Sequence, residues 1–232
     1  MRNLVLYIPS IETGGVEKNL FYIMDYFHNK FDKIYLVTSS KIKGIKINNK
    51  IIQIHPKTNF FLNKSRILKT LTCFFLILKN FKHKNVLILS FQSNFSAIIA
   101  SRLINSKIII RLNTSPEKYI NNSLQKYFFR FIYALADQII VNSIGFKKNF
   151  KKIFRLDSVY ILNPIKKKKL KKKNISFFNN FKGLKILTIG RLTDQKDHIT
   201  LLKAVLLLKL KYKINFKLYL IGRGHNLSLI HI

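Results

Sequence analysis

The stretch NLVLYIPSIETGGVEKNL, residues 3–20, decides the fold of this chain. It opens with the short apolar run NLVLYI, which is typical of a buried strand. From Val16 to about Phe27, apolar residues recur at the spacing of one helical face. Two of the chain's eight glycines, Gly14 and Gly15, stand together between these two segments. A strand, a glycine turn and a helix in this order predict the first unit of a parallel α/β sheet.

The same alternation of apolar strands and amphipathic helices continues as far as residue 165. Strands that are apolar throughout are typical of parallel sheets covered by helices on both faces. We therefore predict a doubly wound α/β domain over residues 1–165. Its predicted strands are 3–8, 33–38, 51–55, 85–90, 107–112, 137–143 and 159–165, and its predicted helices are 16–27, 63–80, 93–104, 122–136 and 144–154.

A second α/β domain is predicted after a basic linker. Residues 166–182 contain the run KKKKLKKK and show no periodicity, which favours a linker. Residues 183–226 then repeat the order of strand, loop, helix and strand. The last six residues, LSLIHI at 227–232, match the translation of an adapter used in sequencing libraries. We therefore expect the native sequence to be interrupted after about Asn226, which leaves this second domain incomplete.

The formal net charge of +34 is the most unusual property of the composition. Such a balance often indicates nucleic-acid binding. Here the lysines are spread along the chain beside many Ile, Asn and Phe residues, which is typical of A/T-rich codon usage. No helix-turn-helix, zinc-finger or RNA-binding signature is present either. We expect no nucleic-acid partner, and a basic surface instead fits peripheral contact with anionic lipids at the inner face of the cell membrane.

The cysteine count and the lengths of the apolar runs exclude other classes of protein. One cysteine, Cys73, is too few for a disulfide framework or a multi-cysteine metal site, and its apolar surroundings predict a core thiol. No apolar run reaches the roughly 18–20 residues that span a bilayer. The sequence begins with a strand instead of a signal peptide. These features predict a cytoplasmic protein.

Two loops have the composition of an anion site. A helix that begins at Gly14 and Gly15 exposes free backbone N–H groups, and glycine lets a phosphate approach them closely. In the second domain, the loop after the first strand carries Gly190, Arg191 and Lys196, whose cations suit phosphate oxygens. The alternative interpretations are a tight turn at the glycine pair and, among 43 basic residues, a chance grouping at the second loop.

Five stretches resemble one family of enzymes in the same order along the chain. They are TGGVEKNL, ADQIIVNS, ILNPI, GRLTDQKDHITLLKAV and FKLYLIGRG. Together they resemble the GT-B glycosyltransferases of the large retaining family four. The resemblance implies two Rossmann-like domains with parallel sheets, the second one incomplete here.

The resemblance also implies a donor substrate, a nucleotide-diphosphate sugar. Gly14, Gly15, Gly190, Arg191 and Lys196 would then bind its diphosphate, which becomes the leaving group. Their charge stabilisation replaces a metal, and since the sequence has no Asp-x-Asp motif we expect neither a metal nor another cofactor. The resemblance leaves the catalytic residues unknown.

On the acceptor side, many relatives carry a His where this chain reads RLNTSPEKY, so Arg111 and Asn113 are the candidate residues there. This loop and SFQSNFSAI resemble a subgroup that transfers amino sugars in polysaccharide or lipid-linked glycan assembly. The implied function is transfer of a hexosyl or hexosaminyl group to a glycan or polyprenyl-linked precursor of a cell-surface polysaccharide. The family's later motif of two Glu separated by seven residues is missing, so we expect this fragment to be inactive.

Other interpretations remain open at this point. Glu17, a family position beside the glycines, also supports the dipole of its helix, and His198 fits a helix cap or a surface position. A sugar-nucleotide epimerase with the GT-B fold is an alternative enzyme, although its usual acidic and His residues are not evident at the first turn. A non-catalytic basic module that binds nucleic acid or anionic membranes is an alternative of another kind.

Overall fold

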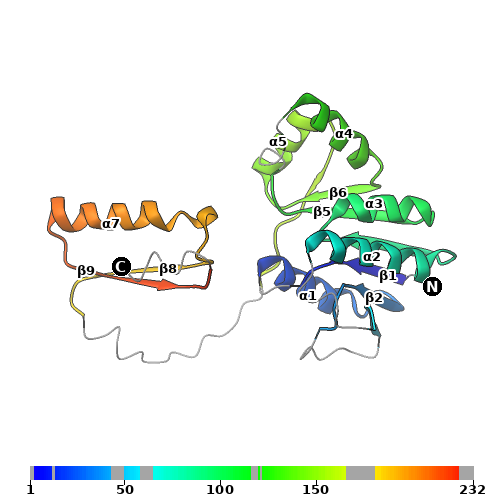
Figure 1. The fold of residues 1–232 in the computed structure, drawn as a ribbon, viewed down its shortest axis with the longest axis horizontal. Coiled ribbons are helices and arrows are strands. Elements are labelled where there is room, and N and C mark those ends of the chain that lie inside the picture. Colours follow the sequence, from blue (N-terminus) through cyan, green and yellow to red (C-terminus); the bar gives the residue numbers. More distant parts are fainter. Residues whose placement is uncertain are drawn as a thin grey trace. The chain divides into compact units, whose positions relative to one another are not determined.

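The computed structural model describes residues 3–11, 14–42, 50–57, 65–115, 120, 122–165 and 181–224. Contacts divide the chain into two compact units, Met1–Lys167 and Lys168–Ile232 (Figure 1). Most of the predicted linker, residues 166–180, and the predicted adapter segment, residues 227–232, lie outside the described residues. Each unit is therefore described by itself.

Unit 1 is built on a seven-stranded sheet in which every neighbouring pair is parallel. The strand order is β3-β2-β1-β4-β5-β6-β7. The chain first builds the sheet outward from β1 to β3 and then crosses to β4 on the other side of β1. This reversal creates a topological switch point between β1 and β4, where ligands usually bind in such folds. The strands are β1 (Asn3–Tyr7), β2 (Lys33–Val37), β3 (Ile51–Ile54), β4 (Val86–Ser90), β5 (Lys107–Leu112), β6 (Gln138–Val141) and β7 (Val159–Tyr160).

Helices on both sides cover the two faces of this sheet, five of them among the described residues. Helix α1 packs Leu20 and Met24 against one face, whereas α2 packs Cys73 and Ile77 against the other (Figure 1). Alternate side chains of each strand enter each of these two cores, so both faces need apolar residues. This requirement explains the continuous apolar runs in the sequence. The helices are α1 (Gly15–Phe27), α2 (Arg66–Phe81), α3 (Asn94–Leu103), α4 (Ser123–Ala134) and α5 (Ile144–Phe154).

The helices of unit 1 begin in two different ways. At α2, α4 and α5 the side chains of Ser65, Asn122 and Ser143 accept a hydrogen bond from a backbone N–H of the first turn. Such caps typically stabilise a helix by about 1 kcal/mol. Helices α1 and α3 have no side-chain cap: α1 follows Gly14, and α3 follows Ser93, whose φ of 52° is left-handed. Both uncapped helices begin at the carboxyl edge of the sheet.

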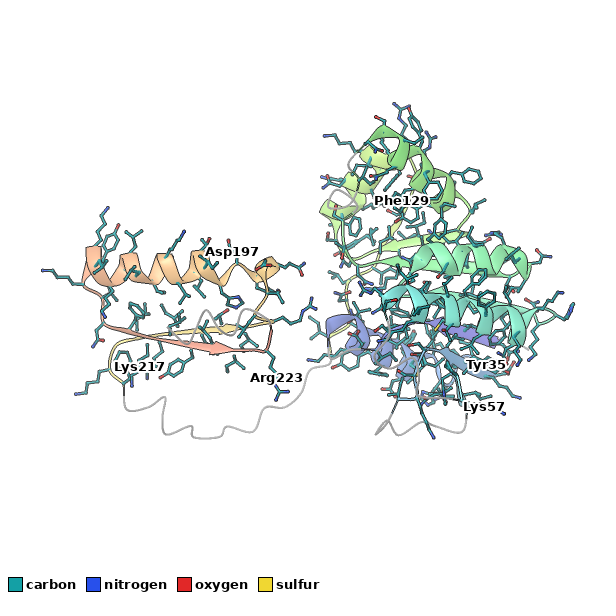
Figure 2. The ribbon with its side chains drawn as sticks, in the orientation of Figure 1. Tyr35, Lys57, Phe129, Asp197, Lys217 and Arg223 are labelled. Carbon is teal, nitrogen blue, oxygen red and sulfur yellow. The ribbon has the colours of Figure 1, made fainter. Side chains whose placement is uncertain are left out.

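Unit 2 is a small parallel α/β unit. Strand β8 (Leu184–Ile189) leads through the short helix η3 (Asp194–Lys196) into α7 (His198–Tyr212), and β9 (Phe216–Ile221) returns parallel to β8. Figure 2 shows Asp197 and Arg223 at the end of this unit where the two strands finish, with Lys217 toward the other end.

The predicted α/β fold is confirmed, with one parallel sheet in each unit. The interpretation of His198 as a helix cap or a surface residue was wrong. Asp197 caps α7, because its Oδ1 accepts a hydrogen bond from the N–H of Thr200 at 3.2 Å, and the His198 side chain is buried.

Candidate functional site

The two glycines of the first turn have different surroundings. A Cβ atom added to Gly14 would lie 2.7 Å from Oε2 of Glu17, whereas one added to Gly15 would meet nothing within 4 Å. Glu17 lies in the first turn of α1 and is buried, with its carboxylate folded back over the start of the helix. That negative charge is favourable at the positive end of the helix. The space beside Gly14 is thus filled from within the protein, and the space beside Gly15 is open.

A polar cavity of about 460 Å³ lies at the carboxyl ends of β4 and β5. Both predicted acceptor-side residues, Arg111 and Asn113, line it. Val16 of α1 also lines the cavity, so the first turn of α1 reaches the same place, although Gly14 and Gly15 are not lining residues. Its other polar walls come from Arg66, Gln92, Ser93, Asn94 and Thr114.

Arg111 is a buried cation. The residue is only 2% exposed. Its Nη2 donates to Oδ1 of Asn163 at 2.6 Å and to the carbonyl of Ile161 at 3.4 Å. Its Nε has no hydrogen-bond partner among the described residues. Burial lowers the pKa of this guanidinium from its usual value, because desolvation disfavours the charged form. Arg111 thereby ties β5 to the segment that follows β7.

Asn113 organises the cavity wall, since its Nδ2 donates to the carbonyl of Phe91 at 2.8 Å. On the next strand, the Ser90 hydroxyl donates to Oδ1 of Asn94 at 2.7 Å, and Nδ2 of Asn94 donates to the carbonyl of Arg111 at 3.0 Å. These bonds join the ends of β4 and β5 to the start of α3. Two polar side chains of the cavity, Asn94 and Asn113, are therefore held in place by hydrogen bonds to the backbone and to Ser90.

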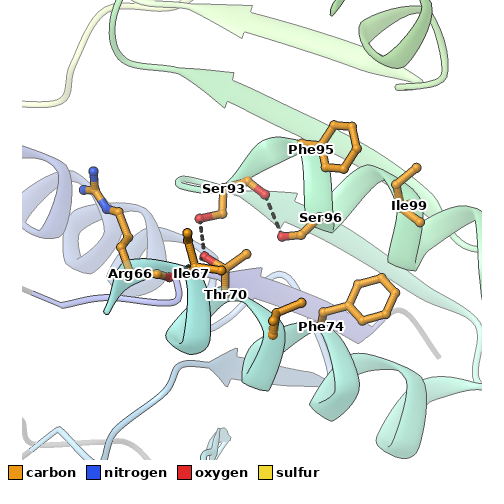
Figure 3. Close-up of a pocket in the computed structure, with 9 residues that line it drawn as sticks. Arg66, Ile67, Thr70, Phe74, Ser93, Phe95, Ser96 and Ile99 are labelled. Carbon is orange, nitrogen blue, oxygen red and sulfur yellow. Dashed lines mark hydrogen bonds between the residues drawn. The ribbon is translucent and has the colours of Figure 1, made fainter. Parts of the chain in front are cut away.

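An apolar groove of about 450 Å³ opens beside the polar cavity, between α2 and α3 (Figure 3). Arg66, Ser93 and Phe95 line both spaces. A hydrogen bond between Ser93 Oγ and Thr70 Oγ1, at 2.9 Å, joins the start of α3 to α2, and one between Ser96 Oγ and the hydroxyl of Tyr7, at 2.7 Å, joins α3 to β1. The sequence prediction missed this groove, and the one local signal for it was the uninterrupted polar run QSN before α3.

In unit 2, the structure brings Gly190 and Lys196 into contact. The aliphatic stem of Lys196 lies across Gly190, so that an added Cβ would be 3.6 Å from its Cε. Arg191, next in the chain, is exposed. The loop is fixed from the other strand, because the N–H groups of Gly190 and Leu192 donate to the carbonyls of Ile221 and Arg223, each at 2.9 Å.

The glycines of the IGRG stretch make this arrangement possible. A Cβ on Gly222 would collide with the carbonyl oxygen of Gly190, and one on Gly224 would collide with that of Leu192. The two loops can approach this closely only where both positions lack a side chain. Gly222 and Gly224 therefore leave the room that the loop carrying Arg191 needs. The sequence analysis had not predicted this role for them.

Two further landmarks have structural roles in unit 1. Oδ2 of Asp137 accepts hydrogen bonds from the N–H of Ile108 at 2.7 Å and from Nη2 of Arg102 at 2.8 Å. This joins the starts of β5 and β6 at the edge of the sheet opposite the polar cavity. Asn163 is the partner of Arg111, as described above. Asn163 thus supports the wall of the site, and Asp137 supports the sheet at its opposite edge.

Comparisons with known proteins relate the chain to glycosyltransferases. No protein-family profile matches it. It is 27% identical over 244 residues to the N-acetylgalactosamine-N,N'-diacetylbacillosaminyl-diphospho-undecaprenol 4-alpha-N-acetylgalactosaminyltransferase of Campylobacter jejuni. The alignment covers 97% of this chain and 63% of that protein. The chain thus spans less than two thirds of the length of this curated relative.

Solved structures give the same relationship at the level of the fold. Anabaena HepE in complex with UDP and glucose superposes with a TM-score of 0.69 at 17% identity, covering 100% of this chain and 65% of that one. The lipopolysaccharide outer core galactosyltransferase WaaB superposes with a TM-score of 0.61 at 15% identity, covering 99% and 63%.

Two classes of feature are not found in the part of the chain that the structure describes. No described helix has the length and apolar character needed to cross a bilayer. No three His, Cys, Asp or Glu residues among those described gather into a group suited to a metal ion. With the parallel sheets of its two units and these structural neighbours, the chain has the α/β fold of GT-B glycosyltransferases.

Proposed function

We propose that this protein is a glycosyltransferase that takes a sugar from a nucleotide-diphosphate sugar and transfers it to a glycan precursor. The observation that carries the proposal is the alignment of 97% of the chain with the N-acetylgalactosaminyltransferase of Campylobacter jejuni. The polar cavity at the switch point of unit 1 supports it, because folds of this class bind ligands there.

The proposed donor site consists of Gly14, Gly15, Gly190, Arg191 and Lys196. Arg191 and Lys196 are both exposed in one loop, and their charges suit a diphosphate leaving group. Gly15 has open space beside the uncapped start of α1, which suits close approach of a phosphate. Arg111 and Asn113 are the proposed acceptor-side residues, with Arg111 positioning the wall of the cavity and Asn113 facing it.

The finer features of the proposal rest on the family resemblance and on the relative's name. They are retention of configuration, a reaction without a metal, transfer of an amino sugar and a lipid-linked acceptor. The relative's name contains an N-acetylgalactosaminyl group as the transferred sugar and a diphospho-undecaprenol as the acceptor lipid. A lipid-linked acceptor in turn favours peripheral contact of this basic protein with the cytoplasmic face of the membrane.

Calorimetric titration with UDP, UDP-glucose and UDP-N-acetylgalactosamine tests the proposal. We expect saturable binding of at least one of them at about 150 mM salt, where long-range attraction to a basic protein is screened. Arg191→Ala and Lys196→Ala should each weaken it about tenfold, because each removes a charged phosphate contact. Lys203→Ala, at an exposed position of α7, is the control and should bind as the unaltered protein does.

Two glycine variants test the other side of the proposed donor site. Gly15→Ala should weaken nucleotide binding without lowering stability, because a Cβ fits the protein but would occupy the space of a phosphate. Gly145→Ala is the matched control, since it also lies exposed in a first helical turn with nothing near an added Cβ. Absence of saturable nucleotide binding, or equal losses in test and control variants, would contradict the proposal.

Turnover is a separate measurement. The printed sequence has no two Glu residues separated by seven, the motif expected to hold the sugar and nucleotide. We therefore expect this chain to bind the donor without transferring the sugar. Conversion of UDP-N-acetylgalactosamine into its epimer would instead support the epimerase alternative.

A further inference from the structure

The polar cavity and the apolar groove of unit 1 adjoin each other and differ in chemistry. They share Arg66, Ser93 and Phe95, which therefore mark the junction between them. The cavity half combines polar side chains such as Gln92, Asn94 and Asn113 with apolar ones, whereas the groove half is mostly apolar, with Ile67, Leu71, Phe74 and Ile99 among its walls. Figure 3 shows Arg66 at one end of the groove and Phe74, Phe95 and Ile99 toward the other, with Ser93 between them. A ligand that fills both halves has a polar head and a hydrocarbon chain.

We infer that the groove between α2 and α3 binds the hydrocarbon chain of a lipid phosphate whose phosphate group is held by Arg66 at the junction with the polar cavity. The inference rests on the proposed function for the class of acceptor and adds where the lipid part of that acceptor is bound. The head group beyond the phosphate then enters the polar cavity, toward Asn113.

The apolar half contains large apolar side chains that are exposed to solvent. Ile67 is 73% exposed and Leu71 is 47% exposed, one helical turn apart on α2. Phe95 is 43% exposed across the groove and packs against Phe128 of α4 with ring centroids 5.7 Å apart. A hydrocarbon chain in the groove would cover these side chains and remove their apolar surface from water. The volume of about 450 Å³ is within the usual range for a small-molecule site.

The polar half supplies the charge complementarity. Arg66 is exposed at the first turn of α2, and no carboxylate forms an ion pair with it among the described residues. A guanidinium in this setting can bind two phosphate oxygens at once. The start of α3 supports the same position, because the Ser93 hydroxyl bonds to Thr70 and leaves that helix without a side-chain cap. Free N–H groups there favour an anion.

The junction is rigid enough to fix such a ligand. Ser93 has a left-handed backbone with φ of 52°, which costs a residue other than glycine some conformational energy. Its bond to Thr70, and the bond of Ser96 to the buried hydroxyl of Tyr7, hold α3 against α2 and the sheet beneath. The spacing of Arg66 from the groove walls therefore does not depend on a loop that closes later.

Titration calorimetry with farnesyl phosphate, farnesol and inorganic phosphate tests the inference on the purified protein. At about 150 mM salt, which screens non-specific attraction, farnesyl phosphate should bind saturably and at least about tenfold more tightly than either farnesol or inorganic phosphate. UDP is titrated into the same samples. If UDP binds and farnesyl phosphate does not, this inference fails while the proposed function stands. If farnesyl phosphate binds and UDP does not, the proposed function fails while the binding of a lipid phosphate in the groove stands.

Paired variants on α2 locate the binding. Leu71→Asn places a polar group in the groove and should weaken farnesyl phosphate several-fold, whereas Leu68→Asn, at a 42% exposed position outside the groove, should not. Arg66→Gln should reduce the preference for farnesyl phosphate over farnesol about tenfold. Lys69→Gln removes the same charge from the same helix outside both spaces and should leave that preference unchanged.

Two further results would overturn the inference. One is that the test and control variants weaken binding of farnesyl phosphate equally. The binding would then depend on the overall charge or hydrophobicity of α2 and not on the groove. The other is binding to vesicles of anionic phospholipid without saturable binding of farnesyl phosphate, which would make the exposed face of α2 and α3 a bilayer contact instead of a chain-binding groove.

Discussion

Gly14 and Gly15 stand together in the sequence and yet have different surroundings. The carboxylate of Glu17 folds back to within 2.7 Å of the place where a Gly14 side chain would begin, so a side chain at Gly14 would displace that carboxylate. No protein atom fills the corresponding space at Gly15, so the fold alone does not require a glycine there. Of the two proposed donor-site glycines, Gly15 therefore has open space for a ligand, whereas a group beside Gly14 would first displace the Glu17 carboxylate.

Cys73 illustrates a residue whose role is purely structural. It is fully buried on α2, as the sequence predicted, and burial raises the pKa of its thiol from 9.0 to about 12 because the thiolate would be desolvated. Between these values the folded protein holds a proton that the unfolded chain releases. Since the unfolded state then binds fewer protons, the free energy of unfolding falls as the pH rises above 9.

We predict that the free energy of unfolding, measured in urea, is lower at pH 10 than at pH 8. This thiol should account for about 1.4 kcal/mol of the difference, which corresponds to one pH unit above the unfolded pKa. Tyr7, whose pKa burial also raises from 10.0, adds to the same trend at still higher pH. Cys73→Ala should show a smaller difference between the two pH values. An equal difference in both proteins would contradict the assignment.

At the scale of elements, the loop after β8 owes its position to the loop after β9. The N–H groups of Gly190 and Leu192 donate to carbonyls beyond or at the end of β9, and Gly222 and Gly224 leave room for the approach. Lys196 then lies across Gly190, beside Arg191 in the chain. The two proposed phosphate ligands are thus positioned by two glycines from another element.

We predict that Gly224→Ala disrupts this loop and that Gly190→Ala does not. A Cβ on Gly224 collides with backbone atoms of Leu192, which must shift at a cost of about 1–3 kcal/mol. A Cβ on Gly190 meets only the flexible stem of Lys196, at 3.6 Å. Hydrogen exchange of the Leu192 amide checks this: its protection should fall in the first variant and persist in the second. Unchanged protection in both variants would show that the loop does not need Gly224.

The sequence predicted the fold better than the site, for a reason visible in particular elements. The strand at 107–112 has three apolar residues in succession, Ile108 to Ile110, because both of its faces are covered, and that signal is local. The groove is lined by residues of two helices, among them Arg66 of α2 and Phe95 of α3, which only the packing of these helices brings to one place. Ser93, between them, has a left-handed backbone, but because it is not a glycine the sequence does not indicate this conformation. Contacts between distant segments leave no periodic pattern, so sequence analysis could not find them.

At the scale of the whole molecule, the net charge of +34 makes every anion a potential ligand. A specific site and a generally basic surface differ in how their binding responds to salt. A polyanion that releases many counterions loses affinity steeply as salt rises, by about 10³–10⁵ between 50 and 200 mM for six to ten phosphate contacts. A nucleoside diphosphate offers only two phosphates, so its affinity depends less on counterion release and more on directed contacts.

We predict that raising the salt from about 50 to about 200 mM weakens binding of UDP by less than roughly tenfold, and binding of a single-stranded oligonucleotide by more than about a hundredfold. Calorimetry with UDP and fluorescence anisotropy with a labelled oligonucleotide measure the two slopes. Arg191→Ala should lower the affinity for UDP at both salt concentrations and leave the oligonucleotide slope nearly unchanged, because one of 43 basic residues contributes little to a diffuse surface. If instead both ligands weaken in parallel and Arg191→Ala affects neither, the binding is that of a non-catalytic basic module, and the glycosyltransferase proposal fails.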